Sequence, residues 1–183
     1  MSVLRGGWYS GARRHESPNR GPRPTGVVPD LLVLHCISLP PGEFGGPGVE
    51  DFFCNDLDWE AHPYFEEIRG LQVSTHFLIR RDGEIVQFVS CDERAWHAGQ
   101  SCFEGRDNCN DFSVGIELEG TDNGPFESAQ YASLVLLSRA LFAAYPEMAE
   151  SRITGHSDIA PGRKTDPGPG FDWTRFHALL AAP

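Results

Sequence analysis

The first concentrated group of apolar residues in this chain is the short run Leu31-Leu-Val-Leu-His-Cys-Ile37. A continuous apolar segment of this length predicts a strand that is buried on both faces. The strand is expected to end at Leu39-Pro-Pro-Gly42, because proline can continue neither a strand nor a helix. Ser113-Val-Gly-Ile-Glu-Leu118 predicts a second strand.

Two further strands and one long helix follow from periodicity. Residues 75–81 and 84–90 predict a hairpin, since the Asp82-Gly83 dipeptide between them is typical of a tight turn. Residues 127–145 predict a helix that Pro146 ends. Its apolar residues recur on one stripe: Tyr131, Leu134, Val135, Leu141, Phe142 and Tyr145.

The remaining segments complete an α/β pattern. Short helices are expected near residues 50–55, 63–69 and 172–181, with a short strand at 152–154. Residues 92–112 lack periodicity and predict a long loop, which in a compact domain is more often functional than not. We therefore expect one domain over residues 1–183, a central mixed β-sheet flanked by helices, with 1–30 as an irregular N-terminal arm packed on it.

Composition narrows the possible partners and location. The formal net charge of −11 argues against a nucleic-acid partner and against adhesion to anionic membranes. The five cysteines are odd in number and form no Cys-x-x-Cys pair, which disfavours a disulfide framework. The first residues have no signal-peptide pattern, and no apolar stretch has the length of a membrane span. Together these features favour a protein of the reducing cytoplasm.

Several side chains are candidates for zinc chemistry. A zinc hydrolase holds its metal with three protein ligands, drawn from His, Asp, Glu and Cys, and leaves a fourth position for water. His35 lies near the end of a predicted strand, and His156 follows Thr154-Gly155 at the end of another. Asp158, Lys164 and Asp166 come soon after His156. Taken singly, a core histidine bonded to backbone and a solvated polar loop explain these residues equally well.

Two carboxylates and one lysine can likewise be interpreted either as solvated surface charges or as catalytic groups. Glu117 and Glu119 point to one face of their strand, so they are either two solvated charges or a proton carrier beside a metal. Lys164 would repel a nearby metal ion, and it makes more sense there if it stabilises an oxyanion. His62, His76 and His97 are further possible ligands. The residues by themselves leave several three-ligand combinations open.

A family resemblance chooses among these combinations. The chain closely resembles the zinc-dependent N-acetylmuramoyl-L-alanine amidases that are related to phage T7 lysozyme and peptidoglycan recognition proteins. Within them it is most similar to the cytoplasmic 1,6-anhydro-N-acetylmuramyl-L-alanine amidases of Gram-negative bacteria. The matching segments run in order through nearly the whole chain: Gly11-Ala-Arg-Arg14, Leu34-His-Cys-Ile-Ser-Leu-Pro-Pro-Gly-Glu-Phe-Gly-Gly46, Arg80-Arg-Asp-Gly-Glu-Ile-Val-Gln87, Arg94-Ala-Trp-His-Ala-Gly99, Cys109-Asn-Asp-Phe-Ser-Val-Gly-Ile-Glu-Leu-Glu-Gly-Thr121 and Thr154-Gly-His-Ser-Asp-Ile-Ala-Pro-Gly-Arg-Lys-Thr-Asp-Pro-Gly-Pro169.

The resemblance implies a fold, a metal site and a reaction. It implies the fold of these amidases and one Zn²⁺ per chain, held by His35, His156 and Asp166. Glu117 would activate water and Lys164 would stabilise the oxyanion. The implied substrate is an anhydromuropeptide from cell-wall recycling, cut between the lactyl group of 1,6-anhydro-N-acetylmuramic acid and L-alanine. We expect a monomer in the cytoplasm, and the resemblance implies that its activity indirectly controls induction of AmpC β-lactamase.

The chain departs from the family pattern at the expected peptide end of the pocket. Gln72 and Asn108 stand where some relatives carry arginine, and Cys36 stands where relatives carry asparagine. We expect Tyr64, Trp96 and Arg106 to bind the substrate instead, although each could equally be a packing residue. Two rival functions remain: a non-catalytic peptidoglycan-binding module, and an exported amidase that acts on intact cell wall.

Overall fold

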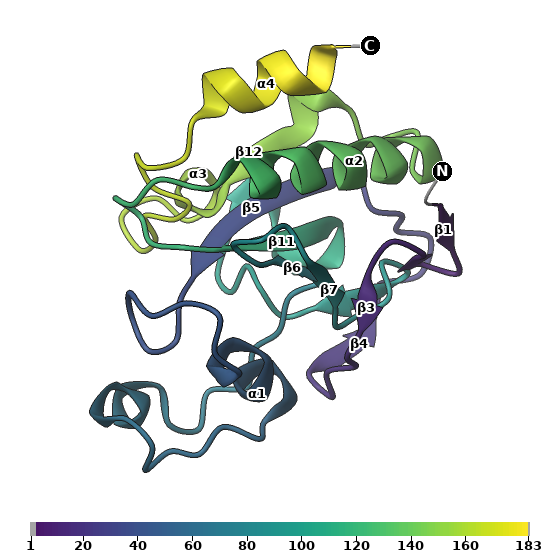
Figure 1. The fold of residues 1–183 in the computed structure, drawn as a ribbon. Coiled ribbons are helices and arrows are strands. Elements are labelled where there is room, and N and C mark those ends of the chain that lie inside the picture. Colours follow the sequence, from purple (N-terminus) through teal and green to yellow (C-terminus); the bar gives the residue numbers. More distant parts are fainter. Residues whose placement is uncertain (1–2, 183) are drawn as a thin grey trace.

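Strands from widely separated parts of the chain meet in one mixed six-stranded sheet, in the order β12-β5-β11-β6-β7-β3 (Figure 1). This computed structural model describes residues 3–182. The first four strands in that order are parallel; β7 runs antiparallel to β6, and β3 pairs with β7 in parallel. The strands of this sheet are β3 (Arg13–Arg14), β5 (Leu31–Ile37), β6 (Phe77–Ile79), β7 (Ile85–Gln87), β11 (Ser113–Glu119) and β12 (Ile153–Gly155).

Alternation along the central strands divides their side chains between two faces. Leu32 and Leu34 of β5 and Ile116 of β11 belong to the core that is closed by helices α2 (Ser128–Ala144) and α4 (Trp173–Ala181). These helices lie together over that face of the sheet in Figure 1. Because strand side chains alternate, the odd-numbered residues of β5 and β11 point to the opposite face. His35 and Glu117, which are register partners, therefore share that opposite face.

The second face is covered partly by α1 (Gly48–Cys54) and the 3₁₀ helix η1 (Pro63–Ile68). Phe52 and Phe53 of α1 pack against Leu78 of β6 and Val86 of β7. The part of this face next to β12 has a smaller core around Leu31 and Val33. Between the two cores the ends of β5 and β11 are free to line a cavity.

The predicted α/β architecture is confirmed, and most predicted elements occur with small shifts of their ends. The helix expected at 127–145 is α2, where Gln130 Oε1 accepts a hydrogen bond from the Glu127 N–H at 2.9 Å. The hairpin closes at Asp82-Gly83 as expected, and β6 and β7 are shorter than predicted. The helix expected near 63–69 is 3₁₀ rather than α.

The loop expected at 92–112 and the arm expected at 1–30 contain short strands that periodicity did not predict. Strand β4 of the arm pairs with β8 of the loop, and β3 joins the edge of the main sheet. Segments of two or three residues are too short to show a period, so only their distant partners define them. The remaining elements are β1 (Leu4–Arg5), β2 (Trp8–Tyr9), β4 (Arg20–Pro22), β8 (Glu93–Ala95), β9 (Cys102–Phe103), β10 (Arg106–Asp107), η2 (Cys109–Asp111), η3 (Glu150–Arg152) and α3 (His156–Ile159).

Within residues 3–182, none of the helices combines the length and the apolar character that crossing a bilayer would require.

Glu50 fastens the N-terminal arm to the body of the molecule. Its carboxylate accepts hydrogen bonds from Arg13 (2.8 Å) and Arg80, and it lies 2.7 Å from His15 Nδ1. Burial alone would raise the pKa of Glu50, but the hydrogen bonds from Arg13, Arg80 and His15 outweigh burial and lower it to about 2. One carboxylate of α1 thereby connects the arm to Arg80, the residue that follows β6.

We expect Glu50→Gln to lower the free energy of unfolding at pH 7 by about 1–3 kcal/mol, because Arg13 and Arg80 lose a charged partner. The folded-state pKa lies below the unfolded value of 4.5, so the contribution of Glu50 is complete above that value and disappears as the pH falls toward 2. Urea unfolding at pH 7 and pH 3 measures both effects. The control is Glu84→Gln, which removes an exposed carboxylate that also pairs with Arg13. It should lower the free energy of unfolding less than Glu50→Gln does. An equal cost of Glu50→Gln at both pH values would contradict this account.

Candidate metal centre

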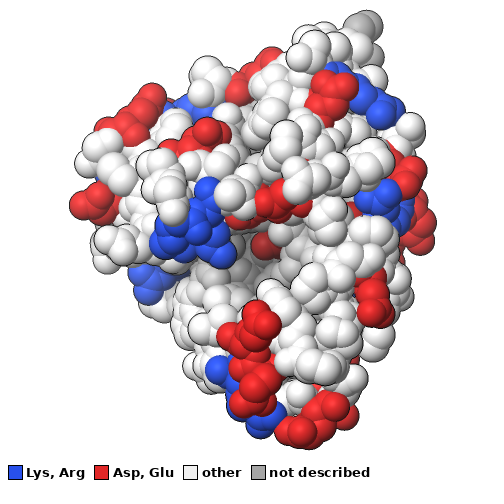
Figure 2. Space-filling view, turned by 90° about the vertical axis from the view of Figure 1, so that its left-hand side faces the viewer, with Lys and Arg blue, Asp and Glu red and all other residues white. Residues whose placement is uncertain are grey.

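A cavity of about 560 Å³ opens at the carboxyl ends of β5, β11 and β12. Figure 2 shows it as a hollow with acidic atoms in its interior and a group of basic residues on its rim. In sheets of parallel strands this edge is where ligands usually bind, because loops from several strands meet there. The lining includes most of the residues that the sequence singled out: His35, Tyr64, Trp96, Glu117, His156, Lys164 and Asp166.

Each polar side chain reaches the cavity for a local reason. His35 occupies an odd position near the end of β5, and Glu117 is its register partner on β11. His156 begins α3 directly after β12, where Asp158 Oδ2 accepts from the Gly155 N–H at 2.9 Å. Asp166 lies on the loop that follows α3. The Ser157 N–H donates a hydrogen bond to the Asp166 carbonyl at 2.9 Å, which holds this loop against the start of α3.

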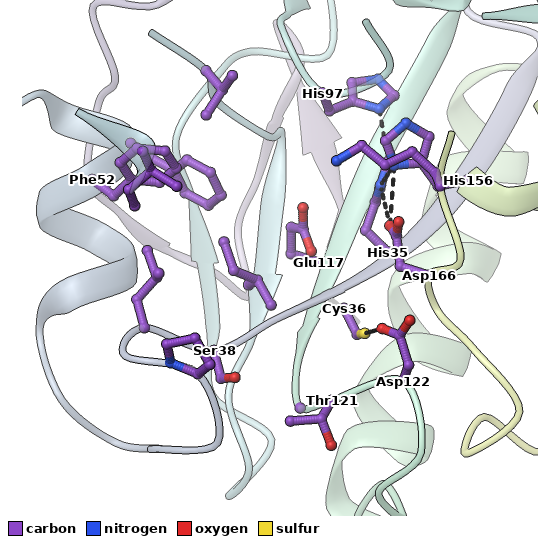
Figure 3. Close-up of a pocket in the computed structure, with 18 of the residues that line it drawn as sticks. His35, Cys36, Ser38, Phe52, His97, Glu117, Thr121, Asp122, His156 and Asp166 are labelled. Atoms are coloured by element: carbon purple, nitrogen blue, oxygen red, sulfur yellow. Dashed lines mark hydrogen bonds and ion pairs between the residues drawn. The ribbon is translucent and has the colours of Figure 1, made fainter. Parts of the chain in front are cut away.

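Three donor atoms of His35, His156 and Asp166 converge on one another (Figure 3). His35 Nδ1 is 2.9 Å from His156 Nδ1 and 3.0 Å from Asp166 Oδ2, and the last two atoms are 3.1 Å apart. Ligands at the usual zinc distances in a tetrahedral site lie about 3.3 Å from one another. The spacing therefore fits three ligands of one zinc ion, and all three residues line the cavity.

The surroundings of His156 leave its Nδ1 free to bind a metal. His156 Nε2 is 3.0 Å from the Ala98 carbonyl, which can only accept a hydrogen bond. The proton of a neutral imidazole must therefore sit on Nε2, and Nδ1 carries a lone pair. A backbone carbonyl in this position is a common partner of metal-binding histidines. The chemistry of the donor set thus fits a divalent cation.

The charges in the group also suit a cation. Burial lowers the pKa of His35 to about 4, so its imidazole is neutral at physiological pH. Asp166 Oδ2, within 3.1 Å of both Nδ1 atoms, supplies the negative charge of the group. One carboxylate and two imidazoles form the kind of donor set that zinc hydrolases use.

Glu117 lies beside this group without a structural partner. Its Oε2 is buried and has no hydrogen-bond partner within residues 3–182. Burial raises the pKa of Glu117 well above its ordinary value, and the charge of Asp166 raises it further. A buried carboxyl group with a raised pKa next to a candidate metal site can exchange a proton with a reacting group.

The other residues of the cavity form two walls. An apolar wall includes Tyr64 and Trp96 together with Phe52, Phe53, Ile68, Leu71 and Val73. The opposite side includes Cys36, whose thiol donates to Asp122 Oδ1 at 3.2 Å, and Thr121 (Figure 3). Lys164, two residues before Asp166, adds a cation at the metal end.

Arg106 is the one predicted site residue that does not line the cavity. Its guanidinium donates to Asp30 Oδ2 at 2.6 Å and lies 3.7 Å from the centre of the Phe112 ring. Sequence reasoning also missed Asp122 and most of the apolar wall. Asp122 meets Cys36 across 86 positions of sequence, a contact that no local pattern reveals.

This mixed sheet, with its donor group at the ends of the parallel strands, is the architecture of the N-acetylmuramoyl-L-alanine amidase class. A family model described as N-acetylmuramoyl-L-alanine amidase matches residues 25–169. The chain belongs to this amidase family.

Individual relatives resemble this chain over nearly the whole of its length. The 1,6-anhydro-N-acetylmuramyl-L-alanine amidase AmpD of Escherichia coli is 58% identical, over 98% of this chain and 97% of its own. A crystal structure of a selenomethionine AmpD derivative superposes with a TM-score of 0.95 at 57% identity, covering 97% of this chain and 99% of the other. The amidase AmiD from E. coli, solved in complex with anhydro-N-acetylmuramic acid-L-Ala-D-gamma-Glu-L-Lys, gives a TM-score of 0.59 at 29% identity, covering 97% and 65%.

Proposed function

We propose that this protein hydrolyses the amide between the lactyl group of 1,6-anhydro-N-acetylmuramic acid and L-alanine in anhydromuropeptides. His35, His156 and Asp166 would hold a single zinc ion per chain. The observation that carries the proposal is the convergence of these three donor atoms beside the unpartnered Glu117. The relatives that share 51–58% of the sequence, all named for this amidase activity, support it.

The bound zinc ion would supply Lewis-acid chemistry, polarising the scissile carbonyl and making water more acidic. Glu117 would take one proton from the attacking water, whose oxygen adds to the amide carbon. Its raised pKa makes the resulting carboxyl group a good donor, so the same residue can pass that proton to the leaving nitrogen. The carbon–nitrogen bond then breaks and the second proton of the water passes to the released amine, which gives the ammonium group of L-alanine and the lactyl carboxylate.

Lys164 would stabilise the negative charge that develops on the carbonyl oxygen. It lines the cavity at the metal end, and a fixed cation lowers the energy of an oxyanion more in a partly buried site than in water. Its position two residues before a metal ligand would otherwise be unfavourable, because the lysine ammonium group and a zinc ion repel each other.

The cavity is suited to a sugar–peptide fragment. Its volume of about 560 Å³ is within the usual range of small-ligand pockets. Tyr64 and Trp96 would pack against the substrate from the apolar wall. A solved relative, AmpDh3 from Pseudomonas aeruginosa, was crystallised in complex with an anhydromuramic pentapeptide, which supports a substrate of this class. For Arg106 to bind substrate, its side chain would have to leave Asp30.

In the cell the protein would act as a cytoplasmic monomer in peptidoglycan recycling. Removing anhydromuropeptides would indirectly limit induction of AmpC β-lactamase. Residues 1–183 would form one amidase domain, with 1–30 as an arm packed on it.

Incubation of the zinc-loaded protein with anhydromuramyl tripeptide tests the proposal. Mass spectrometry should show release of the tripeptide, and a chelator should stop it until zinc is restored. Binding of the fragment without release would favour the rival function of a peptidoglycan-binding module. Intact sacculi provide the second arm: release from sacculi at a rate comparable with the free fragment would favour a cell-wall hydrolase instead.

A further inference from the structure

The hydroxyl group of Ser113, at the start of β11, has a fixed direction. Ser113 Oγ lies 2.6 Å from the Cys109 carbonyl oxygen. Two oxygen atoms this close need a proton between them, and a carbonyl has none to give. Ser113 therefore donates to Cys109, and its remaining lone pairs can only accept. One of them faces His97 Nε2 at 3.1 Å.

The direction of this bond determines where His97 carries its proton. His97 is buried, and its two ring nitrogens face Ser113 Oγ and His35 Nε2. Since the serine oxygen can only accept, His97 Nε2 bears the N–H. A neutral imidazole has one N–H, so His97 Nδ1 is left as an acceptor.

The same reasoning extends to His35. His97 Nδ1 and His35 Nε2 are 2.9 Å apart (Figure 3). Because His97 Nδ1 can only accept, His35 Nε2 carries the proton and donates it. His35 Nδ1 is then left with a lone pair that faces His156 and Asp166.

We propose that His97 and Ser113 are positioning residues that hold His35 in its metal-binding tautomer. This inference rests on the proposed function, in which His35 binds zinc through Nδ1. A chain of three hydrogen bonds runs from His35 through His97 and Ser113 to the Cys109 carbonyl, and that carbonyl sets the direction of all three. His156 needs no such chain, because a carbonyl contacts its ring directly.

Close packing against β11 fixes the position of the His97 ring. A Cβ added at Gly115 would lie 2.5 Å from His97 Cγ and 2.6 Å from Nδ1, far closer than non-bonded atoms approach. The absence of a side chain at Gly115 therefore lets the imidazole lie against the strand between Ser113 and His35. Gly115→Ala should displace the ring and break the chain of hydrogen bonds at its middle.

The first experiment measures zinc affinity by competition with a chromophoric chelator. Ser113→Ala and His97→Leu are each expected to weaken zinc binding about 10–100-fold, the usual effect of losing an outer partner of a metal ligand. His97→Asn, whose amide oxygen can still accept from His35, should recover most of the affinity. The control is Thr75→Val, which removes a buried hydroxyl that donates to the Gly115 carbonyl at 3.0 Å but lies outside the chain.

The second experiment detects the tautomers directly in the zinc-free protein by ¹⁵N NMR of the histidine rings. The wild-type protein should show His35 protonated at Nε2, and Ser113→Ala should show a population protonated at Nδ1. Protonation of wild-type His35 at Nδ1, or zinc affinity in Ser113→Ala and His97→Leu equal to that of Thr75→Val, would overturn the inference. A wild-type protein that binds zinc with these tautomers but cleaves no anhydromuropeptide would instead refute the proposed function alone.

Discussion

Asp166→Asn is expected to remove zinc binding and amide hydrolysis together. Asp166 supplies the only negative charge of the three-donor group, and asparagine keeps its shape while losing that charge. Loss of a residue that hydrogen-bonds to a metal ligand usually weakens metal binding about 10–100-fold. Asp166→Asn should weaken zinc binding more than this, because it removes a ligand itself. Metal analysis after dialysis and the tripeptide-release assay measure the two effects on the same sample.

The control is Asp107→Asn, a substitution of an exposed carboxylate on β10 that does not line the metal cavity. It should keep both zinc and activity. Thermal unfolding of Asp166→Asn should match that of chelator-treated wild-type protein, since both lack the ion and keep the fold. Wild-type zinc affinity in Asp166→Asn would remove Asp166 from the set of ligands.

Glu117→Gln is expected to lower kcat by about 10²–10⁴-fold while the zinc content stays at one per chain. The amide has nearly the same shape as the carboxyl group but cannot accept a proton from water. Because Glu117 Oε2 is buried without a hydrogen-bond partner in the described residues, the substitution should not destabilise the protein. Single-turnover kinetics, metal analysis and urea unfolding test these three expectations.

Glu119→Gln is the matched control, two residues along the same strand face. Its carboxylate accepts from the Gly45 N–H at 2.7 Å, the Arg81 N–H at 3.1 Å and Arg80 Nη1 at 3.3 Å. We therefore expect Glu119→Gln to lower stability and to leave kcat nearly unchanged. Loss of zinc from Glu117→Gln would make Glu117 a ligand, and an unchanged kcat would deny it the role of proton carrier.

The elements that the sequence predicted are those whose pattern is local. The apolar run at residues 31–37 became β5, because seven residues suffice to show burial on both faces. Residues 127–145 became α2, because the stripe that begins at Tyr131 repeats over several turns. Strands β3, β4 and β8 were missed because two or three residues carry no period, and their pairing depends on partners far along the chain.

In the candidate site, too, the sequence indicated some features, whereas others depend on contacts between distant segments. Family resemblance selected His35, His156 and Asp166, whereas residue chemistry alone left the other histidines open as ligands. The direction in which Ser113 and His97 donate depends on distances between β11, the loop before it and β5, and no motif contains that information. Arg106 likewise looked available in the sequence, but its guanidinium pairs with Asp30.

By itself, the sequence determined the alternation of buried strands and amphipathic helices and, through family resemblance, the kind of chemistry. Only the tertiary structure decided which polar side chains meet. His35 and Asp166 are 131 positions apart and lie 3.0 Å from each other because β5 and β12 are adjacent parallel strands whose carboxyl ends share one edge. Parallel pairing depends on contacts between distant segments, so the metal group and the histidine that orients it arise from the sheet as a whole.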